Sequence, residues 1–283
     1  MTASGRLRVR HPDLDAELDD VPRHFMAGGD LVSSHLIAVM SAIFPPGEDY
    51  FVRAVERVRD RVTDPDLAAD VAAFVAQEDE HGEQHRRLNR VLAERGEPID
   101  AVERYVAWVA GLADRHLSPM ANLAITAALE HHTAVVAEIL LGDPEARARF
   151  GHPGPLHLLC WHALEETEHK AVAFDVYRQL GGSERTRVRA MWAMNVGFAL
   201  EIGAWTTIAT LADPATWRHP VRALRSLWRL RTSPFLSRRL FRRLADYHRR
   251  GFHPDDVDST ALVAHWRAEL FGDDGAIEVR TAS

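Results

Sequence analysis

Cysteine and lysine are almost absent from this sequence. Cys160 is the only cysteine among 283 residues, so the chain cannot form an intramolecular disulfide, and a reducing compartment is expected. Lys170 is the only lysine, and nearly all basic side chains are therefore arginines. The N-terminal stretch MTASGRLRVRHPDLDAELDD has no apolar run of the kind a signal peptide needs, so a cytoplasmic protein is expected.

Segments in which apolar and polar residues alternate over the length of a strand are also missing. Apolar residues recur at helical spacing instead. The apolar share of 46% and the charged share of 27% are typical of a soluble globular protein. The sequence therefore predicts a single all-α domain over 1–283. A ferritin-like four-helix bundle is expected over 24–181, and additional C-terminal helices over 183–271 should pack on it.

Proline and glycine mark the expected ends of these helices. Pro45, Pro46 and Gly47 should break a helix that begins near residue 24, after which Glu48 opens the next one. Three dipeptides read as an N-cap or turn residue followed by a proline in the first helical turn: Asp64-Pro65, Ser118-Pro119 and Gly154-Pro155. The last of these helices is expected to continue to Gly181.

Two segments rich in histidine and glutamate interrupt the apolar helical sequence. In QEDEHGEQH (77–85), Glu78 and His81 are three residues apart and share a helical face with His85. In HALEETEH (162–169), the residues at i, i+4 and i+7 share a face: His162, Glu166 and His169. Glu165 and Glu168 fall on other faces and are expected to be solvated.

Two Glu-x-x-His pairs on separate helices, each accompanied by a lone glutamate from another helix, form the ligand pattern of ferritin-like carboxylate proteins. Glu130, deep in an apolar helix, and Glu48 are the candidates for the lone glutamates. Carboxylates would neutralise two divalent cations and imidazoles would complete their coordination, whereas burying the carboxylates alone would be costly.

The predicted metal ligands are therefore Glu48, Glu78, His81, Glu130, His162, Glu166 and His169. Glu78 and Glu166 are the expected catalytic residues. His85 is a candidate extra ligand or an outer hydrogen-bond donor to a ligand. Glu56, Asp30 and His35 are the alternatives to Glu48.

The spacing His-x-x-x-Glu-x-x-His at 162–169 resembles the last ligand helix of di-iron arylamine N-oxygenases of the p-aminobenzoate N-oxygenase type. Most of the chain also resembles a bacterial family described as predicted metal-dependent hydrolases. That second resemblance is carried by FPPGEDYFVRAV (44–55), QEDEH (77–81), WHALEETEHKAVAFDVY (161–177) and GFHP (251–254). The first resemblance implies two iron ions and O₂ chemistry, and the second implies hydrolysis.

The ligand set favours an oxygenase or oxidase in which two iron ions and O₂ oxidise a small hydrophobic or amine-bearing substrate. An external electron donor would then be needed. The alternative is a hydrolase in which zinc or manganese activates water. A third interpretation is a ferritin-like protein for iron storage or sensing. The oligomeric state is left open, with a homodimer among the alternatives.

Charge is unevenly distributed along the chain. The net charge is −7, yet eleven arginines and one acid, Asp246, lie between Arg218 and Arg250. This basic amphipathic segment, 218–250, either contacts the inner membrane face peripherally or pairs with the acidic remainder of the protein. No nucleic-acid partner is expected, because no recognition motif accompanies the charge. The preceding apolar stretch, 190–212, is expected to be a buried helix, with a membrane-facing helix as the alternative. Glu201 should face a partner or a cavity.

Overall fold

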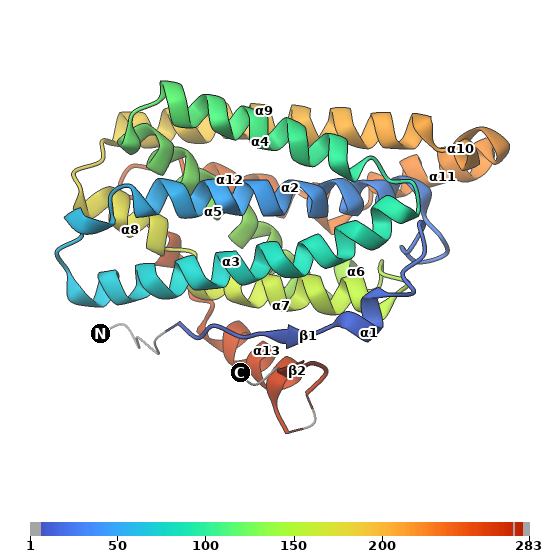
Figure 1. The fold of residues 1–283 in the computed structure, drawn as a ribbon, viewed down its shortest axis with the longest axis horizontal. Helices are drawn as coiled ribbons and strands as arrows, with labels where there is room; N and C mark the ends of the chain where they lie inside the picture. The colour runs from blue at the N-terminus through green and yellow to red at the C-terminus, as the bar shows by residue number, and fades with distance from the viewer. Residues whose placement is uncertain (1–6, 274, 280–283) are drawn as a thin grey trace.

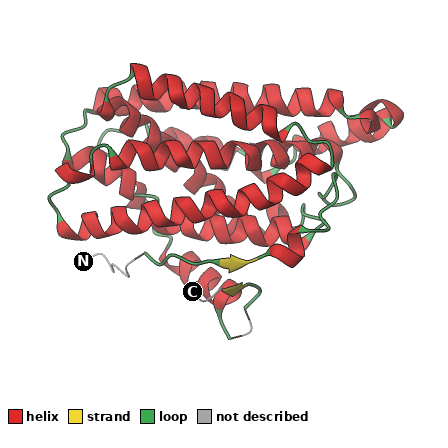
Figure 2. Cartoon of the chain, in the orientation of Figure 1, coloured by secondary structure: helices red, strands yellow, loops and turns green. Residues whose placement is uncertain are grey.

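The computed structural model describes residues 7–273 and 275–279 (Figure 1). Nearly all regular structure in these ranges is helical, which confirms the predicted all-α fold (Figure 2). The described strands are β1 (Pro12–Asp13) and β2 (Glu278–Val279), which pair antiparallel. They join the N-terminal segment to the C-terminal segment.

Four helices form a closed bundle: α2 (Leu31–Glu56), α3 (Pro65–Glu94), α5 (Pro119–Gly142) and α7 (Pro153–His169). Helix α2 packs on α3 and α5, and α7 packs on the same two helices. This is the arrangement that the predicted ligand pattern requires. Membership of the ferritin-like fold family and the division of the chain into domains stay predictions.

Other helices surround this bundle. Helix α4 (Ile99–His116) packs on α2, α9 (Glu184–Ala212) packs on α5 and α2, and α13 (Thr260–Phe271) packs on α7. Helix α11 (Pro220–Leu230) lies on α2 and α12 (Arg238–Asp246) on α5. The short helices are α1 (Asp15–Leu18), α6 (Pro144–Arg147), α8 (Val172–Gln179), α10 (Pro214–Arg218), η1 (Arg59–Arg61), η2 (Pro234–Leu236) and η3 (Pro254–Asp256).

Two large apolar clusters lie at the two ends of the bundle, and a smaller one lies between α5 and α12. One large cluster contains Val39, Leu88, Leu140 and Leu158. The other large cluster contains Phe51, Phe74, Leu123 and Phe174. Along the bundle helices, the glutamate and histidine residues singled out in the sequence lie between the positions that enter these clusters. The polar residues are therefore held between two apolar layers.

The predicted helix starts are confirmed where the cap chemistry is strong. Asp64 accepts hydrogen bonds from the backbone N–H groups of the first turn of α3. Ser118 accepts one from Ala121 at the start of α5, 3.2 Å away. Gly96 ends α3 with φ at +90°, a conformation that favours glycine.

The predicted break at Pro45 and Pro46 was wrong, because α2 continues through both prolines to Glu56. A proline at position 45 removes the helical hydrogen bond to the carbonyl oxygen of Ser41. The Asn89 side-chain amide on α3 donates to that oxygen instead, at 3.1 Å. A neighbouring helix thus compensates for the lost bond. Glu48 consequently lies within a continuous helix and is only 2% exposed.

The helix expected to run from residue 154 to 181 is divided in two. Helix α7 ends at His169, and α8 begins at Val172 after a turn at Lys170 and Ala171. The Lys170 ammonium donates to the carbonyl oxygen of Val257 at 2.7 Å and to the hydroxyl of Ser259 at 2.9 Å. The turn therefore ties the end of α7 to the segment that precedes α13.

Residues 190–212 were expected to form a buried helix, and this prediction was wrong. Helix α9 covers one side of the bundle, and the side chains on its outer face are largely exposed: Trp192, Val196, Leu200, Ile208 and Leu211. Glu201 is half-buried, and this burial raises the pKa of its carboxyl. Among the described helices, only α5 is apolar and long enough to cross a membrane. However, 78% of its most apolar 18-residue stretch is buried inside the protein.

Arg187 on α9 is fully buried, which its position in an arginine-rich sequence did not indicate. Its guanidinium donates to the backbone carbonyl oxygens of Tyr247 and Arg249 and pairs with Glu184 at 2.7 Å. It also lies over the ring of Tyr247, 4.8 Å from the centroid. Arg187 therefore attaches the start of α9 to the turn after α12.

Replacing Arg187 by methionine should lower the free energy of unfolding by about 3 kcal/mol, because carbonyl oxygens and Glu184 would lose a buried charged donor. Urea denaturation followed by circular dichroism measures this change. The matched control is Arg185→Met at an exposed position of the same helix, which should change stability by less than about 0.5 kcal/mol. Equal effects of the two substitutions would contradict the anchoring role of Arg187.

Candidate metal centre

The seven predicted ligands come together inside the bundle. Glu48 comes from α2, Glu78 and His81 from α3, Glu130 from α5, and the remaining residues, His162, Glu166 and His169, from α7. Each of them is at most 3% exposed. The helical spacings read from the sequence therefore direct all seven side chains to one interior region.

The ligand atoms form two groups that are suited to two cations. In one group, atoms of Glu48, His81 and His162 lie within 4.8 Å of one another. In the second, atoms of Glu78, Glu166 and His169 do so. Glu130 joins the second group, because its Oε2 is 3.4 Å from His169 Nε2.

Two carboxylates lie between these groups. Glu166 Oε1 is 3.0 Å from His162 Nε2 in one group and 3.5 Å from His169 Nε2 in the other. Glu78 Oε1 is 3.1 Å from His169 Nε2, and its Oε2 is 3.9 Å from His81 Nδ1. Glu78 and Glu166 are therefore placed to bridge two cations.

Many ligand atoms lack a hydrogen-bond partner although they are buried. Within the described ranges this holds for both carboxylate oxygens of Glu48, Glu78 and Glu130, and for Glu166 Oε2. It also holds for the inward nitrogens His81 Nδ1 and His169 Nε2. A buried polar atom without a partner costs about 1–3 kcal/mol, and more if it is charged. Cations at the centre of the cluster would satisfy all of these atoms at once.

The pKa shifts in the cluster also favour bound cations. Burial is the main factor that raises the pKa of Glu48 well above its ordinary value, and the charges of Glu78 and Glu166 raise it further. The pKa of Glu130 is raised by burial and by the same two carboxylates. Burial lowers the pKa of His81 well below its ordinary value and so favours its neutral, metal-binding form. Two divalent cations would balance the four carboxylate charges.

Each ligand histidine is oriented by a second partner outside the cluster. His81 turns Nε2 toward Glu165 Oε2 at 3.2 Å, which leaves Nδ1 facing the cluster. Glu165 in turn accepts from the Arg10 guanidinium at 2.8 Å. Burial raises the pKa of Glu165 to about 8, although Arg10 opposes this shift. Such carboxylate partners fix the tautomer and the direction of a ligand imidazole.

His85 lies behind His162, one hydrogen bond further from the cluster. Its Nε2 is 2.7 Å from His162 Nδ1, and its Nδ1 is 2.9 Å from Ser41 Oγ. Ser41 donates to Asn89 Oδ1 at 2.7 Å. In the tautomers in which His162 and His85 each donate outward from Nδ1, His162 Nε2 carries no proton and can bind a metal. The third histidine, His169, is held by the side-chain oxygen of Gln77, 3.1 Å from Nδ1.

The expectation that Glu165 and Glu168 are solvated was wrong. Both side chains are buried, because Arg10 pairs with each of them and Arg267 also binds Glu168. Neither arginine lies near α7 in the sequence, so helical periodicity could not reveal the pairing. The apolar residues on both sides of HALEETEH were the only signal that all of its faces are covered.

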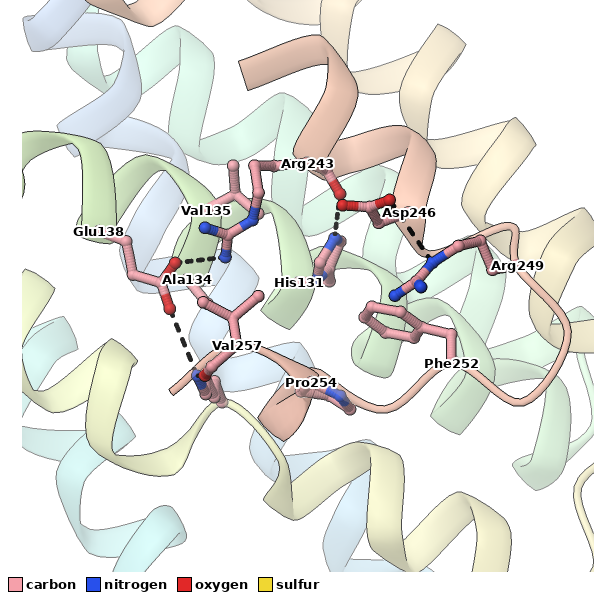
Figure 3. Close-up of a pocket in the computed structure, with 11 residues that line it drawn as sticks. His131, Ala134, Val135, Glu138, Arg243, Asp246, Arg249, Phe252, Pro254 and Val257 are labelled. Atoms are coloured by element: carbon pink, nitrogen blue, oxygen red, sulfur yellow. Dashed lines mark hydrogen bonds and ion pairs between the residues drawn. The ribbon is translucent and has the colours of Figure 1, made fainter. Parts of the chain in front are cut away.

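The histidines next to Glu130 face away from the cluster. His131 Nε2 lies 3.0 Å from the carbonyl oxygen of Arg243, and His132 Nε2 lies 2.8 Å from Asn195 Oδ1. His131 lines a pocket between α5, α12 and the 252–257 segment (Figure 3). In this pocket the charged groups satisfy one another, as Glu138 does with Arg243 and Lys170.

The alternatives to Glu48 lie outside the cluster. Glu56 is exposed near the end of α2, and Asp30 caps the start of α2. His35 is buried between Glu97 and Asp213, 2.9 Å and 3.2 Å away. With His24, His35 and Asp213 make another group at metal-binding spacing, but these side chains already pair with one another and with Arg23.

Alanine substitutions should separate ligands from outer residues. His169→Ala removes a nitrogen ligand, so the bound metal should fall from about two ions per chain to about one. His85→Ala should keep both ions and weaken their binding about 10- to 100-fold, because it only orients His162. Equilibrium dialysis with elemental analysis measures both quantities. Two tightly bound ions in the His169→Ala protein would refute its role as a ligand.

Glu165 and Glu168 form a second matched pair, because both bind Arg10 but only Glu165 contacts a ligand histidine. Glu165→Ala should weaken metal binding about 10- to 100-fold, since His81 loses its orienting partner. Glu168→Ala should leave the affinity for metal unchanged. Competition with a chelator of known affinity measures the difference. An equal loss in both variants would assign the effect to Arg10 and not to His81.

No match for this chain was found among curated proteins or among solved structures. A family model described as "Predicted metal-dependent hydrolase" matches residues 8–258, which include all seven cluster residues. The match covers most of the chain, and the protein therefore belongs to the family of predicted metal-dependent hydrolases.

Proposed function

We propose that this protein is an enzyme that holds two divalent cations between α2, α3, α5 and α7 and uses them for hydrolysis. One observation carries the proposal: buried carboxylate and imidazole atoms converge on one interior region and have no hydrogen-bond partners. Family membership supports hydrolysis as the class of reaction. Bound divalent cations would supply Lewis acidity and would lower the pKa of water.

The protein's own residues would divide the work between them. Glu48 and the nitrogens of His81 and His162 would hold one cation, and Glu130 and His169 would hold the other. Glu78 and Glu166 are the proposed catalytic carboxylates, because their oxygen atoms approach both groups. The apolar layers above and below the cluster would limit the access of bulk water.

O₂-dependent oxidation with two iron ions is the second candidate function. It is favoured by a specific observation: the cluster contains four carboxylates and three imidazoles, with two of the carboxylates between the metal groups. Carboxylate-rich sets of this kind are those of di-iron and di-manganese proteins in four-helix bundles. His162, which the sequence pattern shares with arylamine N-oxygenases, lies inside the cluster. This function would need an external electron donor.

One set of measurements separates the two candidates. The protein is stripped of metal and reloaded without oxygen using zinc, manganese or Fe(II). The proposal predicts cleavage of an ester, amide or phosphoester substrate by the zinc or manganese form, without O₂ consumption. Glu166→Gln should reduce this rate at least about 100-fold, and Glu83→Gln at an exposed position of α3 should not.

The opposite pattern would contradict hydrolysis. If no metal form cleaves any of these substrates and the Fe(II) form consumes O₂ in proportion to its iron content, the second candidate is supported. Loss of that O₂ consumption in the Glu166→Gln protein, but not in Glu83→Gln, would link it to the cluster.

A further inference from the structure

Helix α11 turns its polar side toward the bundle and its apolar side toward solvent, the reverse of an ordinary surface helix. Ser226 is buried, and its hydroxyl accepts from the Val32 backbone N–H at 2.7 Å. Arg222 donates to the carbonyl oxygen of Gly29 at 3.1 Å. The outward side chains are 55–69% exposed: Val221, Leu224, Leu227 and Trp228. Polar contacts therefore attach α11 to the protein and leave its apolar side uncovered.

The uncovered surface continues along α9. Trp192, Leu200 and Leu211 on its outer side are 52–69% exposed. Between Arg189 and Arg218 the charged residues are Glu201, which is half-buried with its Oε1 shielded from solvent, and Asp213, which is buried. Over about 20 residues, or about 30 Å of helix, α9 therefore carries no fully exposed charged side chain.

Helix α4 extends the same surface. It lies beside α9 in Figure 1, and the ring of Tyr105 is 5.8 Å from that of Trp205. Tyr105 and Trp108 on α4 are 40% and 57% exposed. The exposed apolar residues of α4, α9, α10 and α11 together form one surface, the apolar face: Tyr105, Trp108, Trp192, Leu200, Leu211, Trp217, Val221, Leu224, Leu227 and Trp228. An apolar surface of this extent is unusual on a protein that meets only water.

Tryptophan and arginine are the characteristic residues of the apolar face. Besides Trp108, it carries three tryptophans that are 59–68% exposed: Trp192, Trp217 and Trp228. Four exposed arginines lie on α10, α11 and the turn after α11: Arg218, Arg225, Arg229 and Arg231. Arg229 pairs with Asp30 at 3.6 Å, and the other three have no carboxylate at ion-pair distance among the described residues. Residues 214–231 contain no aspartate or glutamate at all.

We infer that the apolar face docks on a bilayer surface that contains anionic phospholipid. Tryptophans are enriched at the level of lipid headgroups, and an amphipathic helix with basic residues lies in the plane of that interface. Lipid phosphates would supply the negative charge that the unpaired arginines lack. A two-fold contact with a second copy would bring the same unpaired arginines of both copies together. Residues 214–231 contain no acidic side chain that could balance their charge.

The docking surface differs from the basic segment 218–250 that the sequence suggested. Helix α12 packs inward, because Leu240 and Tyr247 are buried and Arg243 pairs with Glu138. Within 218–250 the lipid contact is therefore assigned to α10 and α11, whereas α12 holds the chain to α5. Most of the apolar area comes from α9 and α4, which lie outside that segment.

Flotation of the metal-loaded, full-length protein with lipid vesicles tests this inference. We expect binding to phosphatidylcholine vesicles that contain about 30% phosphatidylglycerol, and weaker binding to phosphatidylcholine alone or at high salt. The double variants Leu224→Ser/Trp228→Ser and Arg218→Ala/Arg225→Ala should each lower the partition coefficient about tenfold or more. All four positions are exposed, so the fold should be unaffected.

Two matched controls remove similar groups elsewhere. Arg90→Ala/Arg95→Ala removes two exposed arginines at α3, and Leu236→Ser/Phe241→Ser removes two exposed apolar side chains near α12. Both should float like the unchanged protein. Equal losses in the controls, or no loss in the test variants, would overturn the inference. A second outcome would also overturn the inference: the unchanged protein fails to float with the vesicles, and light scattering shows that it is a dimer which Leu224→Ser/Trp228→Ser disrupts.

Discussion

Burial of four glutamate carboxylates in the middle of a helical bundle is the constraint on which the rest of the structure depends. Carboxylates this close together, each at most 2% exposed, repel one another and lose their hydration. The bundle contains no lysine or arginine that faces them directly among the contacts of the described residues. Metal cations are the natural source of the missing positive charge, and the three inward imidazoles are suited to bind them.

The layers around the cluster follow from that constraint. Apolar clusters at both ends of the bundle close it off along the helix axes. Around the sides, each imidazole is held by its own partner: Glu165 for His81, His85 for His162 and Gln77 for His169. Arg10 in the N-terminal segment pairs with Glu165, so a residue far from α7 in the sequence helps to position the candidate ligand His81.

The helical arrangement and the cluster could be predicted from the sequence because both depend on local spacing. Glu78 and His81, or Glu166 and His169, share a face whatever surrounds their helix. Glu165 could not be placed in the same way, because its burial depends on an arginine 155 residues away. The continuity of α2 through Pro45 depends on Asn89 from another helix.

The exposure of α9 was unpredictable for a similar reason. An apolar helix is buried only if other elements cover all of its faces, and no periodicity in residues 190–212 indicates how many do. The structure covers one side and leaves the other open. The inverted polarity of α11 also becomes visible only when Ser226 and Arg222 are seen to face inward.

Anomalous diffraction from crystals of the metal-loaded protein would test the two-cation centre most directly. Data collected at the absorption edge of the bound metal should show two peaks inside the bundle, about 3.5–4 Å apart, with Glu78 and Glu166 between them. A single peak, an empty bundle, or a peak only among His24, His35 and Asp213 would contradict the assignment.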